Sequence, residues 1–378
     1  MKSHAMQAPT TLLSWLRGTA IAGAALFFAG LYFDPEHVWI AFLVGFTLFT
    51  GLAVAGPFFL SLLTLSRARW PGQWRRIPEA MVSTLPFGLL IGIVLLSGLR
   101  ALYEWSDAER VAQDELLAHK SAYLNPIGFG SRLAVYFALW TWLGRRLVAA
   151  LRAQDEQPGV AASRRAVRAA AAFLVVFAIT FSMASVDWLQ SLEPHWFSTI
   201  YALVVLSTVA LAGLSVCSLV ALAFARKPAL AALASPERVE DLGRLFIGLS
   251  LFWAYIGFCQ HMLIWYTNMP EETSWYVTRS QGEWPIVARV CFALCWLVPF
   301  LSLMPKKLRR DPKIVARVAV AVLAGTILHL YYLVAPAHYG AHMGTGVLEV
   351  AVPLAALAGF LWTLLRSLAR TPSDPVRV

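Results

Sequence analysis

Apolar runs of twenty or more residues recur along the whole of this 378-residue chain, and they constrain its fold more than any other feature. A helix of about 20 apolar residues is long enough to cross the ~30 Å hydrocarbon core of a bilayer. Charged residues make up 14% of the chain, whereas a typical soluble domain has about 25%. Because no long polar stretch interrupts the pattern, the sequence predicts one transmembrane domain and no separate soluble domain.

The apolar runs predict an all-α polytopic membrane protein with about ten transmembrane helices. The predicted spans are 12–33, 39–65, 78–99, 127–150, 167–189, 196–225, 243–267, 284–304, 314–335 and 345–367. The first run is long for the apolar core of a cleaved signal peptide and lacks a convincing cleavage site. We therefore expect it to remain in the protein as the first helix.

The longest connection, residues 100–125, is charged but contains apolar side chains at helical spacing. The apolar positions are Leu102, Tyr103, Val111, Leu116 and Leu117. This pattern is typical of an amphipathic helix that lies on a membrane surface or against a partner. We expect a periplasmic amphipathic segment rather than a further span.

The distribution of the basic residues predicts the orientation of the chain. With ten spans, 25 of the 31 Lys and Arg fall on one side of the membrane. The remaining six are Arg100, Arg110, Lys120, Arg132, Arg279 and Arg289. Cytoplasmic loops carry the excess of Lys and Arg in membrane proteins, so both termini are predicted to be cytoplasmic. The net charge of +10 then has a topological origin, and we expect lipid rather than nucleic acid as its partner.

The cysteines give no sign of a metal site or of a covalently attached cofactor. Cys217, Cys259, Cys291 and Cys295 all lie within apolar runs and form neither a CxxC pattern nor a zinc-binding spacing. We expect them to be small buried side chains. His338 and His342 are four residues apart, which suits a metal only if a helix continues through Pro336 and Gly340.

Ionisable residues within the predicted spans are functional candidates, because each costs about 2.5–3.5 kcal/mol to insert into a membrane. They are Arg132, Asp187, His261, Arg289, His329 and Glu349. All six are predicted to lie in the outer third of the membrane. Just above them the chain places Glu193, His195, Glu271, Glu272, Glu283, His338 and His342. The sequence thus predicts a polar layer that opens to the outer face.

Two roles fit such a layer. Carboxylates and histidines can receive protons from a quinol during its oxidation and pass them outward. Alternatively, Arg132 and Arg289 could pair with Asp187 and Glu349 and simply tie helices together.

The two histidines within the spans, His261 and His329, share a predicted depth, so they could be core residues, proton carriers or haem b ligands. The inner half offers few ionisable groups apart from Glu79, and no carboxylate relay across the whole membrane is predicted.

Three segments resemble one family of membrane proteins. They are Ser182–Thr199 (SMASVDWLQSLEPHWFST), Phe252–Thr273 (FWAYIGFCQHMLIWYTNMPEET) and Leu102–Arg132, which includes Lys120 and Tyr123-Leu124-Asn125. In these segments the chain is similar to ActF, a membrane protein of bacterial alternative complex III, which is a quinol:electron-acceptor oxidoreductase. ActF belongs to the polysulfide-reductase-like membrane subunits.

The resemblance implies two four-helix bundles with peripheral helices in a bacterial inner membrane. It also implies a subunit without a bound redox cofactor, which contacts quinol or menaquinol at most. The expected partners are an iron–sulfur subunit, haem c subunits and a related membrane subunit. The quinol site of such complexes is generally assigned to that related membrane subunit, and proton conduction has been proposed for ActF. Asp187, Glu193 and His195 lie inside the matching motif and are the candidates that the resemblance supports.

Two other functions compete with this one. A secondary transporter would place its substrate site near the membrane midplane between repeated halves with broken helices, and neither feature is apparent in the sequence. A purely structural anchor for redox subunits would use the outer loops as a docking surface.

Overall fold

The computed structural model describes residues 6–68, 70–344 and 346–370, and within these ranges the chain forms helices and no strand. Lys2, Arg69 and Arg377, which are counted above among the inner basic residues, lie outside the described residues. The long helices are α1 (Thr10–Phe33), α2 (Pro35–Leu65), α8 (Pro126–Glu156), α9 (Val160–Trp188), α10 (Tyr201–Phe224), α11 (Pro236–Thr267), α16 (Pro312–Val334) and α18 (Val347–Arg370).

Shorter helices complete the remaining spans and the connections. They are η1 (Gly72–Arg75), α3 (Arg76–Val82), α4 (Leu85–Leu95), η2 (Leu96–Gly98), α5 (Leu99–Leu102), η3 (Glu104–Ser106), α6 (Ala108–Gln113), α7 (Glu115–Lys120), η4 (Gln190–Leu192), η5 (Pro228–Ala234), α12 (Pro270–Arg279), α13 (Trp284–Phe292), η6 (Ala293–Leu297), α14 (Val298–Leu303), α15 (Lys306–Arg309) and α17 (Pro336–Tyr339).

Nine helical stretches of the described chain are long and apolar enough to cross a membrane. They are α1, α2, η1–α5, α9–η4, α10, α11, α13–α14, α16–α17 and α18. A tenth long helix, α8, extends over 31 residues and packs along α9. The predicted fold class, an all-α multi-pass membrane protein with about ten spanning helices, is confirmed.

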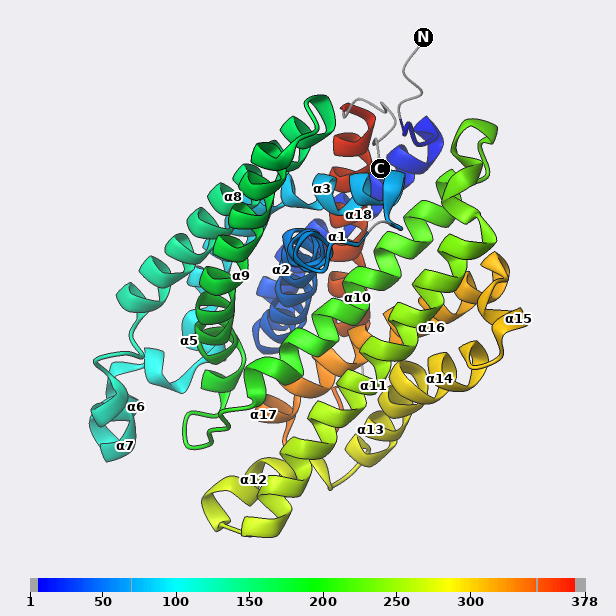
Figure 1. The fold of residues 1–378 in the computed structure, drawn as a ribbon. Coiled ribbons are helices and arrows are strands. Elements are labelled where there is room, and N and C mark those ends of the chain that lie inside the picture. The colour runs from blue at the N-terminus through cyan, green and yellow to red at the C-terminus, as the bar shows by residue number, and fades with distance from the viewer. Residues whose placement is uncertain (1–5, 69, 345, 371–378) are drawn as a thin grey trace.

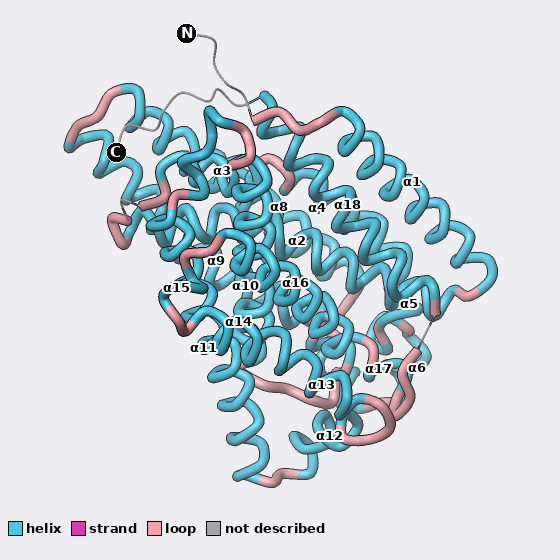
Figure 2. The backbone as a smooth tube through the Cα atoms, turned by 90° about the vertical axis from the view of Figure 1, so that its right-hand side faces the viewer, coloured by secondary structure: helices cyan, strands magenta, loops and turns pink. Residues whose placement is uncertain are grey.

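The helices form two four-helix bundles and one peripheral pair (Figures 1 and 2). The first bundle contains α2, the α3–α5 stretch, α8 and α9, and the second contains α10, α11, the α13–α14 stretch and α16. Helices α1 and α18 pack against each other, and α18 also packs on α2. Helices α2 and α10 join the two bundles and are the most buried spans. In their most apolar segments, 94% and 83% of the residues are buried.

Small residues allow α2 and α10 to approach each other closely. A Cβ atom on Gly51 of α2 would lie 2.5 Å from Cγ1 of Val209, and one on Gly213 of α10 would lie 2.4 Å from Cβ of Ala55. Gly51 and Ala55 are four residues apart, as are Val209 and Gly213, so each pair occupies one helix face. Glycine and alanine at such positions let the backbones of membrane helices pack directly.

The contact of α1 with α18 also depends on one glycine. A Cβ atom on Gly23 would lie 2.0 Å from Cβ of Ala355. We expect Gly23→Leu to destabilise the docking of α1 by about 1–3 kcal/mol, because a tightly packed contact does not accept added methylene groups. Thermal unfolding in detergent measures this loss. Gly18→Leu is the matched control, since no atom lies within 4 Å of the added Cβ. Equal unfolding temperatures of the two variants would show that the contact between α1 and α18 does not depend on Gly23.

Two predicted spans are less regular than the apolar pattern indicates. The third is broken at Ser83 and Thr84, whose hydroxyls donate to the carbonyls of Ala80 and Met81 at 2.6 and 2.7 Å. Such bonds compete with the helical pattern. The sixth predicted span, α10, begins at Tyr201 rather than at residue 196, because residues 193–200 form bends, turns and irregular backbone.

Residues 100–125 form several short helices instead of one amphipathic helix. Leu102, Trp105 and Leu117 are at most 2% exposed, so the segment buries apolar side chains against the first bundle. The hydroxyl of Tyr103 donates to the carbonyl of Trp188 at 2.8 Å and joins the segment to the end of α9. Burial raises the pKa of Tyr103 well above its usual range, and the charge of Asp187 raises it further.

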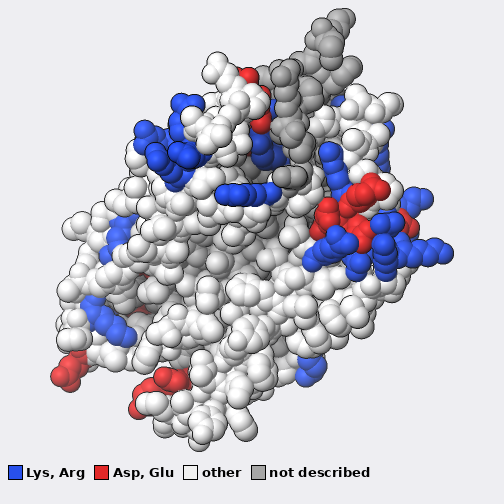
Figure 3. Space-filling view, in the orientation of Figure 1, with Lys and Arg blue, Asp and Glu red and all other residues white. Residues whose placement is uncertain are grey.

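The two ends of the helical assembly differ in charge. The start of α1 and the end of α18 lie at one end, together with α3 and α15, and most Lys and Arg visible on the face in Figure 3 gather there. We call this the basic end. The opposite end carries α6, α7, α12 and α17 (Figure 1). It contains Trp105, Trp188, Trp196, Trp275 and Trp284, and we call it the aromatic end.

Candidate functional site at the aromatic end

Arg132 of α8 and Asp187 of α9 form a bidentate ion pair near the aromatic end. Nε and Nη2 of Arg132 donate to the two carboxylate oxygens at 2.9 and 3.0 Å, and the Tyr136 hydroxyl donates to Oδ2 at 2.7 Å. The Asp187 side chain is only 1% exposed. Both of its oxygens accept hydrogen bonds, two of them charge-assisted, so the pair ties α8 to α9 and leaves no free proton-accepting oxygen. This is the pairing that the sequence offered as the structural alternative.

A second ion pair joins Glu193, in the loop after η4, to the buried Arg279 at the end of α12. Nη2 of Arg279 donates to Oε1 of Glu193 at 2.7 Å, and Nη1 donates to the carbonyl of Trp275 at 3.1 Å. The Arg279 side chain is 1% exposed, and its guanidinium carbon lies 3.7 Å from the centroid of the Trp275 ring. Charge pairing and cation–π contact together hold the 193–200 loop against α12.

His195 and Lys120 connect the same loop to α7. Nε2 of His195 lies 2.9 Å from Oδ2 of Asp114, and Nζ of Lys120 donates to the carbonyl of Pro194 at 2.6 Å. The backbone N–H of Leu117 lowers the pKa of Asp114, and the neighbouring His195 lowers it further. Burial lowers the pKa of Lys120. The three motif residues thus all contact other elements: Asp187 and Glu193 through ion pairs with arginine, and His195 through its contact with the Asp114 carboxylate.

The lowered pKa of Asp114 predicts a pH-dependent contact. A carboxylate whose folded-state pKa lies below its unfolded value, about 3.9 for Asp, stabilises the fold above that value. The stabilisation is lost as the pH falls through the lower folded-state pKa. We expect the protection of α7 amides against hydrogen exchange, relative to the intrinsic exchange rate at each pH, to fall once the pH drops below about 4. Asp114→Asn should give fast exchange already at pH 7, and an unchanged rate in that variant would contradict the contact.

His329 of α16 lies inside the second bundle. Its Nδ1 is 2.8 Å from Oγ1 of Thr208 on α10, and Nε1 of Trp253 on α11 donates to the same hydroxyl at 3.2 Å. The residue is 8% exposed. His329 therefore has partners from two neighbouring helices, as a satisfied core histidine has.

His261 and Arg289 have different surroundings from the rest of the predicted layer. His261 is exposed on α11, and its ring packs edge-on against Tyr276 with the centroids 4.9 Å apart. Arg289 is exposed on α13 and forms no ion pair with the described residues. The structure therefore does not bring Arg289 together with Glu349, and His261 does not join His329 in the bundle interior.

Glu349 lies in the first turn of α18 and differs from the other buried carboxylates. Its Oε1 accepts a hydrogen bond from the Tyr339 hydroxyl at 2.8 Å. Its Oε2 is buried and has no hydrogen-bond partner, and it is the sole carboxylate oxygen of the described residues in that state. The residue as a whole is 8% exposed. No Lys, Arg or His of the described residues forms an ion pair with it.

The surroundings of Glu349 connect it to the surface of the aromatic end. The ring of His37, on α2, stacks on Tyr339 with the centroids 4.9 Å apart. Nδ1 of His37 lies 2.6 Å from Oδ1 of Asp34, and these two side chains are 39% and 46% exposed. A buried carboxylate oxygen without a donor is costly, and a proton or a donor group from a ligand removes that cost. Oε2 of Glu349 is therefore available to accept a proton.

The buried carboxylates at the basic end are paired with arginine. Glu79 of α3 accepts from Nε of Arg75 and Nη1 of Arg76 at 2.9 and 3.0 Å. Glu240 of α11 accepts from Nη2 of Arg244 and Nε of Arg310 at 2.8 and 2.6 Å. These pairs hold loops to helix ends. Among the described residues, Glu349 is thus the one carboxylate with a buried oxygen that lacks a hydrogen-bond partner.

Several residues of these clusters escape prediction from the sequence. Arg279, Glu240, Tyr339 and His37 carry no sequence pattern that marks them as partners of a buried charged group. Pro336, which begins α17, and Gly340, which follows its last residue Tyr339, are the available signal that the chain turns back there. No protein-family model matches the chain, and no curated protein matches it significantly.

Proposed function

We propose that this chain is an integral membrane subunit of a respiratory quinol:electron-acceptor oxidoreductase of the alternative complex III type. In this role it receives protons at the aromatic end while quinol is oxidised. The observation that carries the proposal is the buried, unpaired Oε2 of Glu349 beside Tyr339. The motifs at Ser182–Thr199 and Phe252–Thr273, which resemble that family, support the assignment to the complex.

The chemistry assigns one task to this chain and another to its partners. Oxidation of a quinol releases two electrons and two protons. The electrons pass to an iron–sulfur or haem c partner subunit. Oε2 of Glu349 accepts a hydroxyl proton from the quinol, releases it toward the aromatic end and then accepts the second. The Tyr339 hydroxyl holds the carboxyl group in place through Oε1.

The half-exposed pair His37 and Asp34 lies where such protons reach solvent. In the proposed orientation the basic end faces the cytoplasm of a bacterium, in agreement with the positive-inside rule. Protons would then be released at the periplasmic side of the inner membrane. The ion-paired residues Asp187, Glu193 and His195 brace the loops around this face instead of carrying protons.

The membership in a complex is tested by gentle purification of the native assembly from its host. We expect the chain to copurify with an iron–sulfur subunit, haem c subunits and a related membrane subunit, and the assembly to reduce an acceptor with menaquinol. A chain that purifies alone after mild solubilisation and catalyses transport would contradict the proposal and favour a secondary transporter.

A structural anchor is the second candidate, and the end of α11 favours it. Trp265 and Tyr266 are 70% and 80% exposed in the last turn of α11, and α11 with α12 projects from the bundle in Figure 2. Large exposed aromatic side chains are frequent at protein interfaces. We expect Trp265→Ala with Tyr266→Ala to reduce the recovery of partner subunits severalfold. The control is Tyr32→Ala with Phe33→Ala, because these two side chains are also exposed, at the end of α1. Equal recovery of partner subunits in the two double variants would show that the end of α11 is not the docking surface.

A further inference from the structure

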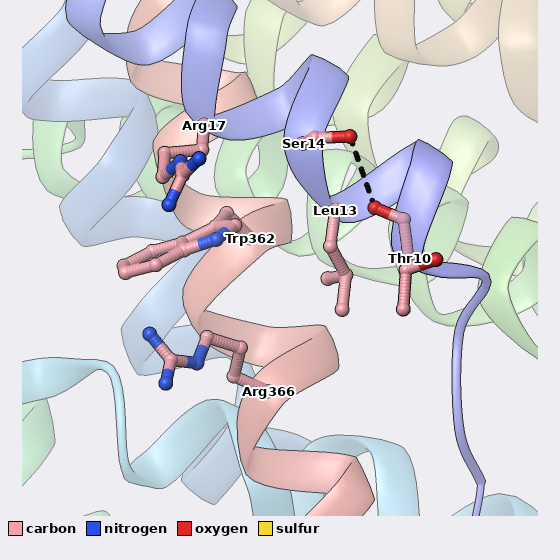
Figure 4. Close-up of a pocket in the computed structure, with 6 residues that line it drawn as sticks. All are labelled: Thr10, Leu13, Ser14, Arg17, Trp362 and Arg366. Atoms are coloured by element: carbon pink, nitrogen blue, oxygen red, sulfur yellow. Dashed lines mark hydrogen bonds between the residues drawn. The ribbon is translucent and has the colours of Figure 1, made fainter.

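A groove of about 350 Å³ lies between α1 and α18 near the basic end (Figure 4). It is lined by Thr10, Leu13, Ser14, Arg17, Trp362 and Arg366. The guanidinium groups of Arg17 and Arg366 lie on either side of the Trp362 ring in Figure 4. The guanidinium carbon of Arg366 lies 4.8 Å from the ring centroid of Trp362. Two cations from two helices therefore face one partly apolar groove.

Neither arginine has an anionic partner within the described chain. Both are exposed, and neither forms an ion pair or donates a hydrogen bond to a described residue. Helix α1 contains no acidic residue, and the single acidic residue of α18, Glu349, lies at the opposite end of that helix. By contrast, the two buried carboxylates at the basic end, Glu79 and Glu240, already bind other arginines. The groove thus has two positive charges and no negative charge to balance them.

The position of the groove determines what reaches it. Helix α1 is on the periphery, and its outward side chains Trp15, Ile21 and Phe28 are 77%, 62% and 66% exposed. In a multi-pass membrane protein this face meets lipid chains. The groove lies at the basic end of that face, at the level where lipid head groups begin. An occupant must therefore combine an anionic group with apolar chains.

We propose that the groove between α1 and α18 binds the phosphate of an anionic phospholipid. Arg17 and Arg366 would donate to the phosphate oxygens, because the guanidinium fork matches phosphate geometry. Trp362 would contact the glycerol and upper acyl region, as aromatic side chains do at membrane interfaces. The acyl chains would follow the exposed face of α1. The hydroxyl of Ser14 already donates to the carbonyl of Thr10 at 3.0 Å and adds no donor. This site is independent of the quinol function proposed above.

The first test compares lipids that remain on the purified full-length chain. The variant is Arg17→Gln with Arg366→Gln, and the matched control is Arg164→Gln with Arg165→Gln, two exposed arginines of α9 at the same end. Native mass spectrometry after extraction in mild detergent counts the bound phospholipids. Since each surface arginine strengthens anionic-lipid binding by about fivefold to tenfold, we expect the variant to bind phosphatidylglycerol at least about tenfold more weakly. The control should bind like the unaltered protein.

The second test locates the lipid at Trp362. Phosphatidylglycerol with brominated acyl chains should quench part of the tryptophan fluorescence in nanodiscs, and Trp362→Phe should remove that part. Brominated phosphatidylcholine should not produce it, and inorganic phosphate should neither produce nor abolish it. The proposal is overturned if the Arg17→Gln, Arg366→Gln variant retains phosphatidylglycerol like the control. It is also overturned if brominated neutral lipid reproduces the Trp362-dependent signal, or if free inorganic phosphate abolishes it.

Discussion

Asp187→Asn should lower the free energy of unfolding by about 3–5 kcal/mol, because it leaves a largely buried arginine without its counter-charge. In the unaltered protein both oxygens of Asp187 accept from Arg132, and Tyr136 donates to one of them. The Asn side chain keeps one acceptor oxygen but no negative charge. Thermal or denaturant unfolding in detergent measures the loss, provided that the transition is reversible.

A double variant separates the charge from the hydrogen bonds. Arg132→Gln with Asp187→Asn places two neutral amides in the pair, so no uncompensated charge stays buried. We expect the double variant to recover at least half of the stability lost in Asp187→Asn. If instead the two substitutions destabilise additively, Arg132 and Asp187 do not act as a pair and their structural assignment is wrong.

The number and length of the spans follow from the sequence because bilayer thickness and hydropathy set both. A break in a helix is harder to predict. The hydroxyls of Ser83 and Thr84 bond to their own helix and interrupt the third span. The turns of residues 193–200 delay α10, and they are held by Arg279, 86 residues away from Glu193. The contact between Glu193 and Arg279 comes from the tertiary fold and leaves no local signal in the sequence.

The partners of the candidate residues could not be predicted from the sequence. Arg132 and Asp187 are 55 residues apart, and only the packing of α8 on α9 brings them together. Arg289 offered the same pattern, an arginine in an apolar run, yet it is exposed on α13. Helix rotation decides between these outcomes, and periodicity defines rotation poorly in a segment that is apolar on all sides.

Glu349→Gln should lower the quinol-dependent turnover of the intact complex by about 100-fold or more, the usual contribution of a positioned proton acceptor. Gln has the shape of Glu but cannot take up a proton at the position of Oε2. Because Oε2 has no partner in the protein, the substitution breaks no hydrogen bond there. Subunit content and haem c spectra of the variant complex establish that assembly is intact before turnover is compared.

Two further variants define the cause of such a loss. Glu36→Gln is the matched control, because Glu36 is exposed at the same end of the molecule, next to His37 in sequence. It should leave turnover unchanged. Tyr339→Phe removes the hydroxyl that donates to Oε1 and should lower turnover by a smaller factor, about tenfold, as expected for a residue that positions the acceptor. Equal turnover in Glu349→Gln and Glu36→Gln would show that Glu349 carries no proton.

The central claim is that Glu349, and not Asp187, changes its protonation during quinol oxidation. Infrared difference spectroscopy of the assembled complex, recorded on addition of menaquinol, detects the C=O band of a carboxylic acid as it forms or disappears. We expect such a band in the unaltered complex and in Glu36→Gln, and none in Glu349→Gln. A band that persists in Glu349→Gln but vanishes in an assembled Asp187→Asn complex would contradict the account and return the proton-accepting role to Asp187.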